Sequence, residues 1–177
     1  VFILFHMLLI MPTRLQVLIP FGVAAVIVGV AGIVSLPSEV KIDANSNFLT
    51  GVIQLDEKTL DVYIADTDPR RMRGLMWEDQ NFLGNDKGML FVFDGPGTRS
   101  MWMKNMQFYI DIIWFDENGK VVEIQENVAP CVTPLEVMSC KSDGVSADNA
   151  QYVLEVISGY VDENSVTKDS QLVIISI

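Results

Sequence analysis

Hydrophobic and polar positions divide this chain into an apolar N-terminal part and a mixed C-terminal part. Residues 15–36 include no charged side chain, and Gln16 and Ser35 are the polar residues among them. A helix over this stretch would be about 33 Å long, enough to cross the ~30 Å hydrocarbon layer of a bilayer. Buried helices of soluble proteins are rarely apolar on every face. The pattern therefore predicts an N-terminal membrane helix.

The charges that flank this stretch predict its orientation. Arg14 is the one charged residue before it, so the positive-inside rule keeps the N-terminus in the cytoplasm and the rest of the chain outside. A cleaved signal peptide is the alternative. We expect a hydrophobic anchor at 1–36, of which 1–10 could be an over-extension of the reading frame. A polar linker follows at 37–50, and an extracytoplasmic globular domain occupies 51–177.

The pattern of the domain is typical of a mainly β (α+β) protein. One small helix is expected to begin around the sequence Asp-Thr-Asp-Pro at 66–69 and to end near Gly74 or Trp77. Asn118-Gly119 predicts a β-hairpin with a type I′ turn. Seven to eight short strands would form a compact barrel or sandwich. The predicted strands cover residues 52–55, 60–64, 88–93, 100–104, 110–115, 120–126, 152–157 and 172–175.

Cys131 and Cys140 are the two cysteines of the chain, and both lie in a long loop at 127–149. In an extracytoplasmic loop of this kind a structural disulfide is expected. A redox-active pair and a pair of metal ligands are the alternatives. Their spacing does not match the Cys-x-x-Cys motif, and no second pair of cysteines could complete a metal site.

The segment 99–111 holds the most unusual combination of side chains. On a strand Met101 and Met103 would share one face, and Trp102 and Lys104 the other. If the methionine face is buried, the other face offers an aromatic ring and an ammonium group, with an amide just beyond. Such a patch suits a sugar or another planar polar ligand. The candidate ligand-binding residues are Arg73, Arg99, Trp102, Lys104, Asn105 and Asp111.

Two other interpretations of the same residues remain open. Trp102 could be covered by a loop, and the charged members of the set, Arg73, Arg99, Lys104 and Asp111, could form an internal ion-pair network. The thioethers of Met101, Met103 and Met106, with those of Met72, Met76 and Met89 elsewhere, could bind Cu(I), although methionine also fills irregular space in cores. We predict neither a resident metal nor a cofactor.

Five blocks of sequence occur in the order found in a known family: ADTDPRRMRGLM at 65–76, GMLFVF at 88–93, RSMWMKNM at 99–106, IDIIWFDENGKVV at 110–122 and YVLEVISG at 152–159. Together they make residues 51–177 similar to the DUF 192 family, domains of unknown function. Met106 stands where the family usually has threonine, and residues 109–111 replace a proline-containing turn. The resemblance implies a β-rich fold with a small helix, often secreted or membrane-anchored, often with a cysteine pair where Cys131 and Cys140 lie. It implies no reaction.

The charge of the chain narrows the choice of partners. A formal net charge of −11 repels nucleic acid, so we expect none as a partner. The one histidine, His6, lies in the possible over-extension at 1–10, and no nucleophile–base pair is recognisable. We therefore predict a non-catalytic binding or accessory module for a carbohydrate, another envelope component or a membrane protein. The alternatives are an enzyme that acts on envelope polymers with carboxylates such as Asp111 and Asp116, a structural subunit of a membrane complex, and a Cu(I)-binding protein.

Overall fold

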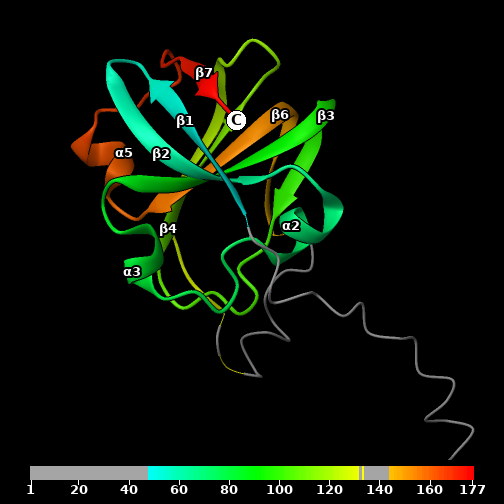
Figure 1. Ribbon diagram of the computed structural model, residues 1–177, viewed down its shortest axis with the longest axis vertical. Helices are drawn as coiled ribbons and strands as arrows, with labels where there is room; N and C mark the ends of the chain where they lie inside the picture. Colours follow the sequence, from blue (N-terminus) through cyan, green and yellow to red (C-terminus); the bar gives the residue numbers. More distant parts are fainter. Residues whose placement is uncertain (1–47, 132, 134–143) are drawn as a thin grey trace, which may run out of the picture. The chain divides into compact units, whose positions relative to one another are not determined.

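The computed structural model describes residues 48–131, 133 and 144–177, in which seven strands form a single sheet (Figure 1). Three helices of four to six residues accompany the sheet within these ranges: α2 (Asp68–Arg73), α3 (Gln80–Leu83) and α5 (Tyr160–Glu163). The strands are β1 (Leu49–Leu55), β2 (Lys58–Ala65), β3 (Lys87–Met101), β4 (Ile110–Phe115), β5 (Val121–Val128), β6 (Val145–Ile157) and β7 (Leu172–Ser176).

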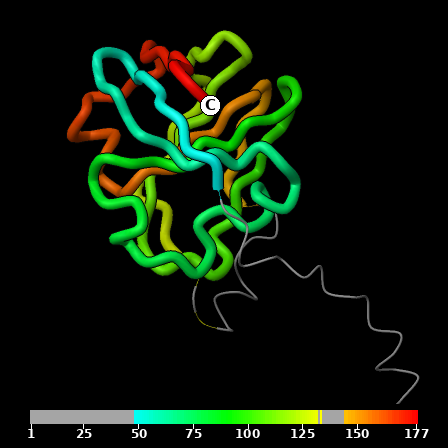
Figure 2. The backbone as a smooth tube through the Cα atoms, viewed as in Figure 1, coloured from blue at the N-terminus to red at the C-terminus, as the bar shows by residue number. Residues whose placement is uncertain are grey.

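The order of the strands in the sheet is β5-β4-β6-β3-β2-β1-β7. β2 and β3 run parallel, because the chain crosses between them through α2 and α3, as the tube in Figure 2 shows. The other neighbouring strands are antiparallel. The edge strands β5 and β7 approach each other at a bridge between Lys120 and Gln171. The prediction of a mainly β fold is confirmed, but the strands form one open sheet rather than a closed barrel or a two-sheet sandwich.

Both faces of the central strands are buried, which explains why β3, β4 and β6 are apolar over consecutive residues. One face packs with α5 in the α5 core, whose members are Ile53, Leu55, Leu60, Val62, Ile64, Leu90, Ile113, Phe115, Val121, Leu154, Val156, Tyr160, Val161, Val166 and Leu172. The other face forms the methionine core: Ala65, Leu75, Leu83, Met89, Phe91, Met101, Met103, Met106, Phe108, Ile110, Ile112, Trp114, Ala147, Ala150 and Val153.

Local sequence signals predict α2 correctly. Thr67 is its N-cap residue, Pro69 lies in its first turn, and Gly74 ends it with φ 48°. Proline suits the first turn because the missing amide has no helical partner there, and glycine tolerates the positive φ of the helix end. The helices α3 and α5 were not predicted, because four residues are too few to show a helical periodicity.

Two predicted details differ in the structure. The segments 88–93 and 100–104 were expected as separate strands, but one strand, β3, includes the first segment, bends at irregularities on either side of Gly97 and ends at Met101. Beyond Met101 the second segment makes only an isolated bridge between Lys104 and Cys131. The hairpin between β4 and β5 is confirmed, although its turn is not type I′. Gly119 has φ 79° while Asn118 is not in the left-handed region, and Asp116 accepts the amides of Asn118 and Lys120.

Several predictions fall on residues outside the described ranges. Among the described residues no helix has the length and apolar character needed to cross a membrane, and the predicted anchor at 15–36 lies outside them. Cys131 is described but Cys140 is not, so the disulfide stays a prediction. Strand β1 begins at Leu49, within the last two residues of the predicted linker at 37–50.

Candidate functional site

A cleft of about 430 Å³ lies between helix α2 and the long strand β3. Its lining is largely aromatic and aliphatic, with one carboxylate, one guanidinium and one hydroxyl among the side chains. The lining residues are Asp68, Arg71, Met72, Phe91, Phe93, Ser100, Met101 and Trp102. A concave, mostly apolar surface with a few polar groups is typical of a site for a small ligand.

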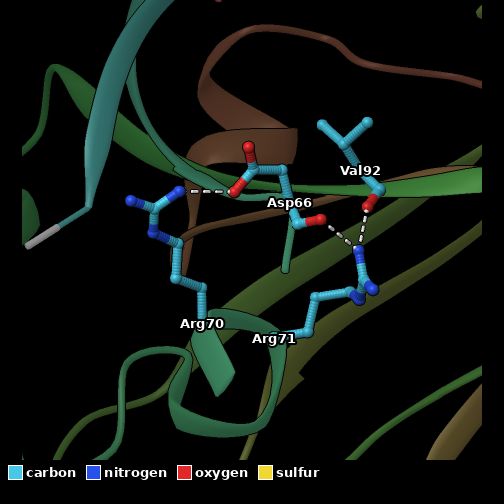
Figure 3. Close-up of polar contacts among 4 residues, drawn as sticks. All are labelled: Asp66, Arg70, Arg71 and Val92. Atoms are coloured by element: carbon cyan, nitrogen blue, oxygen red, sulfur yellow. Dashed lines mark hydrogen bonds and ion pairs between the residues drawn. The ribbon is translucent and has the colours of Figure 1, made fainter. Parts of the chain in front are cut away.

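Arg71 connects the two walls of this cleft (Figure 3). Its Nη1 donates to the carbonyl oxygens of Asp66 and Val92, each at 2.7 Å. Its Nη2 forms an ion pair with the Asp68 carboxylate at 2.6 Å. Hydrogen bonds from a charged donor are stronger than neutral ones, so these contacts fix α2 against β3. The neighbouring Arg70 pairs with the Asp66 carboxylate at 2.7 Å, which also holds the start of the helix.

The guanidinium groups of two arginines, one on α2 and one on β3, lie near the ring of Phe93. The Arg71 guanidinium carbon lies 5.2 Å from the ring centroid, and that of Arg99 lies 4.1 Å from it. Arg99 also donates to the carbonyl oxygens of Gly95 at 2.6 Å and Ala150 at 3.2 Å. Cations stack favourably on aromatic faces, so both arginines stabilise the position of Phe93. Arg99 supports the cleft without being one of its lining residues.

Trp102 and Lys104 form the exposed side of the segment that the sequence singled out. Met101 and Met103 are 6% and 5% exposed, whereas Trp102 is 40% exposed. The Lys104 ammonium lies 5.7 Å from the centroid of the Trp102 ring. The predicted alternation is therefore confirmed, and the methionine face is the buried one. Of the six candidate residues, Trp102 is the one that lines the cleft.

Asn105 holds three loops together through its backbone. Its amide donates to the Cys131 carbonyl at 3.1 Å, and its own carbonyl accepts the amide of Trp77 at 2.9 Å. Asn105 has φ 59°, in the left-handed region that asparagine tolerates better than most residues. The side chain is half-buried, and its Nδ2 lies 3.9 Å from the Met76 sulfur. These contacts make Asn105 a positioning residue at the base of the Trp102 segment.

Arg73 and Asp111 are also placed away from the cleft. The Arg73 side chain is 12% exposed, forms an ion pair with Glu78, and places its guanidinium carbon 4.8 Å from the Phe48 ring centroid. Asp111 is fully buried in β4. Its carboxylate accepts the backbone amides of Asn127 at 2.8 Å, Gly159 at 3.0 Å and Val161 at 3.1 Å. A buried carboxylate needs such donors, so Asp111 ties β5 and α5 to β4.

The carboxylates and methionines named for an enzyme or a copper site have structural contacts in the described part of the chain. Asp111 and Asp116, the carboxylates named for an enzyme, are engaged by backbone amides at opposite ends of β4. No group of three or more His, Cys, Asp or Glu residues within the described ranges could hold a metal ion. Met101, Met103 and Met106 are all buried in the methionine core. This location fits a packing role, and Cu(I) binding stays a hypothesis.

Seven of the eight residues that line the cleft were not among the candidate ligand-binding residues: Asp68, Arg71, Met72, Phe91, Phe93, Ser100 and Met101. Arg71 was assigned to a helix without a function, and Phe93 was the last residue of a predicted strand. No local pattern shows that these residues meet, because the cleft forms only when β3 packs beside α2. The run of three arginines in four positions at 70–73 was the one available hint, since so many cations in an acidic chain require partners.

Comparison with known proteins supports the family resemblance. The chain is similar to a crystal structure from Sinorhizobium meliloti 1021, described as a "putative transcription regulator", with 25% identity and a TM-score of 0.61 over 74% of this chain and 98% of the other. It is also similar to a protein of unknown function from Novosphingobium aromaticivorans DSM 12444, with 19% identity and a TM-score of 0.57 over 78% and 94%. No curated protein matches. The family model DUF192 (Uncharacterized ACR, COG1430) matches residues 51–174, so this chain belongs to the DUF192 family.

Proposed function

We propose that this protein is a non-catalytic binding module that holds a carbohydrate of the cell envelope in the cleft between α2 and β3. The observation that carries the proposal is the position of Trp102, which is 40% exposed and forms one wall of the cleft. An exposed tryptophan beside a hollow provides a flat apolar platform, and the C–H face of a sugar ring can stack on such a surface.

The other lining residues suit the same kind of ligand. Met72 is 37% exposed and adds a flexible apolar contact on the helix side. The Asp68 side chain is 91% exposed, so its carboxylate can accept hydrogen bonds from ligand hydroxyl groups. Ser100 adds a hydroxyl group on β3. A few polar groups among apolar ones suit a molecule with one apolar and several polar edges.

The proposal includes the location expected from the sequence. A helix at 15–36 would hold the module on the membrane, with the domain on the extracytoplasmic side where envelope polymers are found. The net charge of −11 does not favour nucleic acid as a partner. A membrane-protein partner and a structural role in a membrane complex are the competing hypotheses, and the experiment below distinguishes them.

The test is a glycan array with the full chain and two tryptophan variants. Trp102→Ala removes the wall of the cleft. Trp77→Ala is a matched control, because Trp77 is 52% exposed but is not a lining residue of the cleft. We expect the wild type and Trp77→Ala to bind the same glycans, and Trp102→Ala to lose at least ten-fold in affinity.

A pull-down from solubilised membranes with the same three proteins covers the competing hypotheses. Retention of one defined membrane protein by all three, without glycan binding, would favour a structural subunit and contradict the carbohydrate proposal. Equal glycan binding by Trp102→Ala and the wild type would also contradict it, because the cleft would then not be the site.

A further inference from the structure

A second hollow lies on the β1–β2 side of the sheet, at the edge formed by β7. This groove has a volume of about 360 Å³ and shares no lining residue with the cleft beside α2. Its lining combines a carboxylate, an ammonium group, a phenol and hydroxyl groups. The residues are Thr50, Gly51, Val52, Asp61, Val62, Tyr63, Lys87 and Ser176. None of the candidate residues from the sequence is among them.

Two side chains of opposite charge line this groove, and they do not form an ion pair with each other. Asp61 on β2 and Lys87 at the start of β3 are register partners in the parallel pair. Opposite charges on facing residues of neighbouring strands commonly attract each other. Within the part of the chain that the structure describes, however, Asp61 and Lys87 form no ion pair with each other or with any other residue. The Lys87 ammonium instead lies 5.8 Å from the centroid of the Tyr63 ring.

Aromatic packing forms one side of the groove, and an irregular strand pairing forms the other. The Tyr63 ring stacks on Phe82 of α3 with centroids 4.3 Å apart and planes at 19°, and Phe48 lies 6.4 Å away. On the other side, the pairing of β1 with β7 shifts register between Val52 and Ile53. Such bulges re-aim side chains and often lie beside binding sites. The groove is therefore shaped by the packing of aromatic rings around Tyr63 and by the interrupted hydrogen-bond ladder between β1 and β7.

We propose that this groove binds a small zwitterion, a free α-amino acid. The ligand's ammonium group pairs with Asp61 and its carboxylate pairs with Lys87, so that each protein charge gains the partner it lacks. A simple anion would be repelled by Asp61 and a simple cation by Lys87, which favours a ligand that carries both charges. The hydroxyl groups of Thr50 and Ser176 can donate to the ligand carboxylate, and Val52 offers apolar contact to its side chain. This proposal does not depend on the carbohydrate cleft.

The test is ligand-observed saturation-transfer NMR with the full chain and three probes: glycine, L-leucine and L-phenylalanine. N-acetyl-L-leucine lacks the ammonium charge, and L-leucine amide lacks the carboxylate. We expect saturable binding of at least one free amino acid, and at least ten-fold weaker binding of both blocked forms of leucine than of L-leucine. No saturable signal from any of the three probes, or equal signals from the blocked and free forms, would overturn the proposal.

Variants locate the binding at this groove. Asp61→Asn and Lys87→Gln should each weaken amino-acid binding at least ten-fold. Both positions are exposed, so the urea midpoint should hardly move and a loss of binding will not be a loss of folding. Asp169→Asn and Lys58→Gln remove the same charges from exposed positions that do not line the groove, and should bind as the wild type does. Undiminished binding by Asp61→Asn and Lys87→Gln would place the site elsewhere and refute the inference.

Discussion

Glu155 is a carboxylic acid in the middle of the sheet, and its burial predicts an unusual dependence of stability on pH. It lies on β6 between Met89 of β3 and Ile112 of β4, its register partners, and is 3% exposed. Its Oε2 has no hydrogen-bond partner among the described residues. Loss of hydration disfavours the charged form, and raises the pKa of Glu155 from 4.5 to about 8.

The sign of the effect follows from proton binding. The unfolded chain ionises this group near pH 4.5, whereas the folded protein keeps it protonated until about pH 8. The folded state therefore binds more protons across this window, and the free energy of unfolding falls as pH rises through it. At about 1.4 kcal/mol per pH unit, the total loss approaches about 5 kcal/mol above pH 8, and about 3 kcal/mol of it is already present at pH 7.

Glu155→Gln removes the ionisation while it keeps the size and polarity of the side chain. We expect the variant to match the wild type near pH 4.5, and to exceed its free energy of unfolding by about 3 kcal/mol at pH 7. Urea unfolding of the full chain at pH values from 4.5 to 9 measures the difference. The comparison is necessary because other groups titrate as well. For example, hydrogen bonds from the Ile124 amide and the Lys168 side chain lower the pKa of Glu123.

The difference between variant and wild type, rather than either curve alone, decides the outcome. Glu57→Gln is the matched control, because Glu57 is exposed and its replacement removes a carboxylate without changing the buried site. If the difference for Glu155→Gln is flat between pH 5 and 9, the carboxylate is hydrated in the folded protein and the reasoning about its burial is wrong.

Further predictions concern the structural supports of the fold. Asp111→Asn should lower the free energy of unfolding by about 2–4 kcal/mol, because an amide cannot accept all three backbone amides that the carboxylate accepts; urea unfolding measures this, and an unchanged midpoint would contradict it. Gly119→Ala should lower the free energy of unfolding more than Gly84→Ala, for which we expect a loss of about 1 kcal/mol. Both glycines have positive φ, but only at Gly119 would a new Cβ overlap the Leu172 carbonyl; equal thermal midpoints would refute this. Alkylation before and after reduction should raise the mass only after reduction if Cys131 pairs with Cys140, and two free thiols in the native protein would disprove the pairing.

The predicted site was recovered from the sequence only in part. Alternation along residues 101–104 places the methionines opposite Trp102 and Lys104, because successive side chains of an extended segment point to opposite sides. Which side is buried depends on whether another element covers it. The structure shows that the methionine side joins the core while Trp102 faces the cleft. Arg73, Arg99 and Asp111 were candidates because of their charge, but charge alone does not reveal the carbonyls, amides or rings that surround a residue.

By itself the sequence determined the features that depend on neighbouring residues. Proline and glycine fixed the ends of α2, Asn-Gly marked the hairpin between β4 and β5, and apolar runs marked the central strands, because these signals act within a few residues. Only the tertiary structure decided the strand order, the parallel pairing of β2 with β3, the cleft and the burial of Glu155. These features depend on contacts between residues distant in the sequence, and hydration, packing and charge pairing are set by those contacts rather than by local pattern.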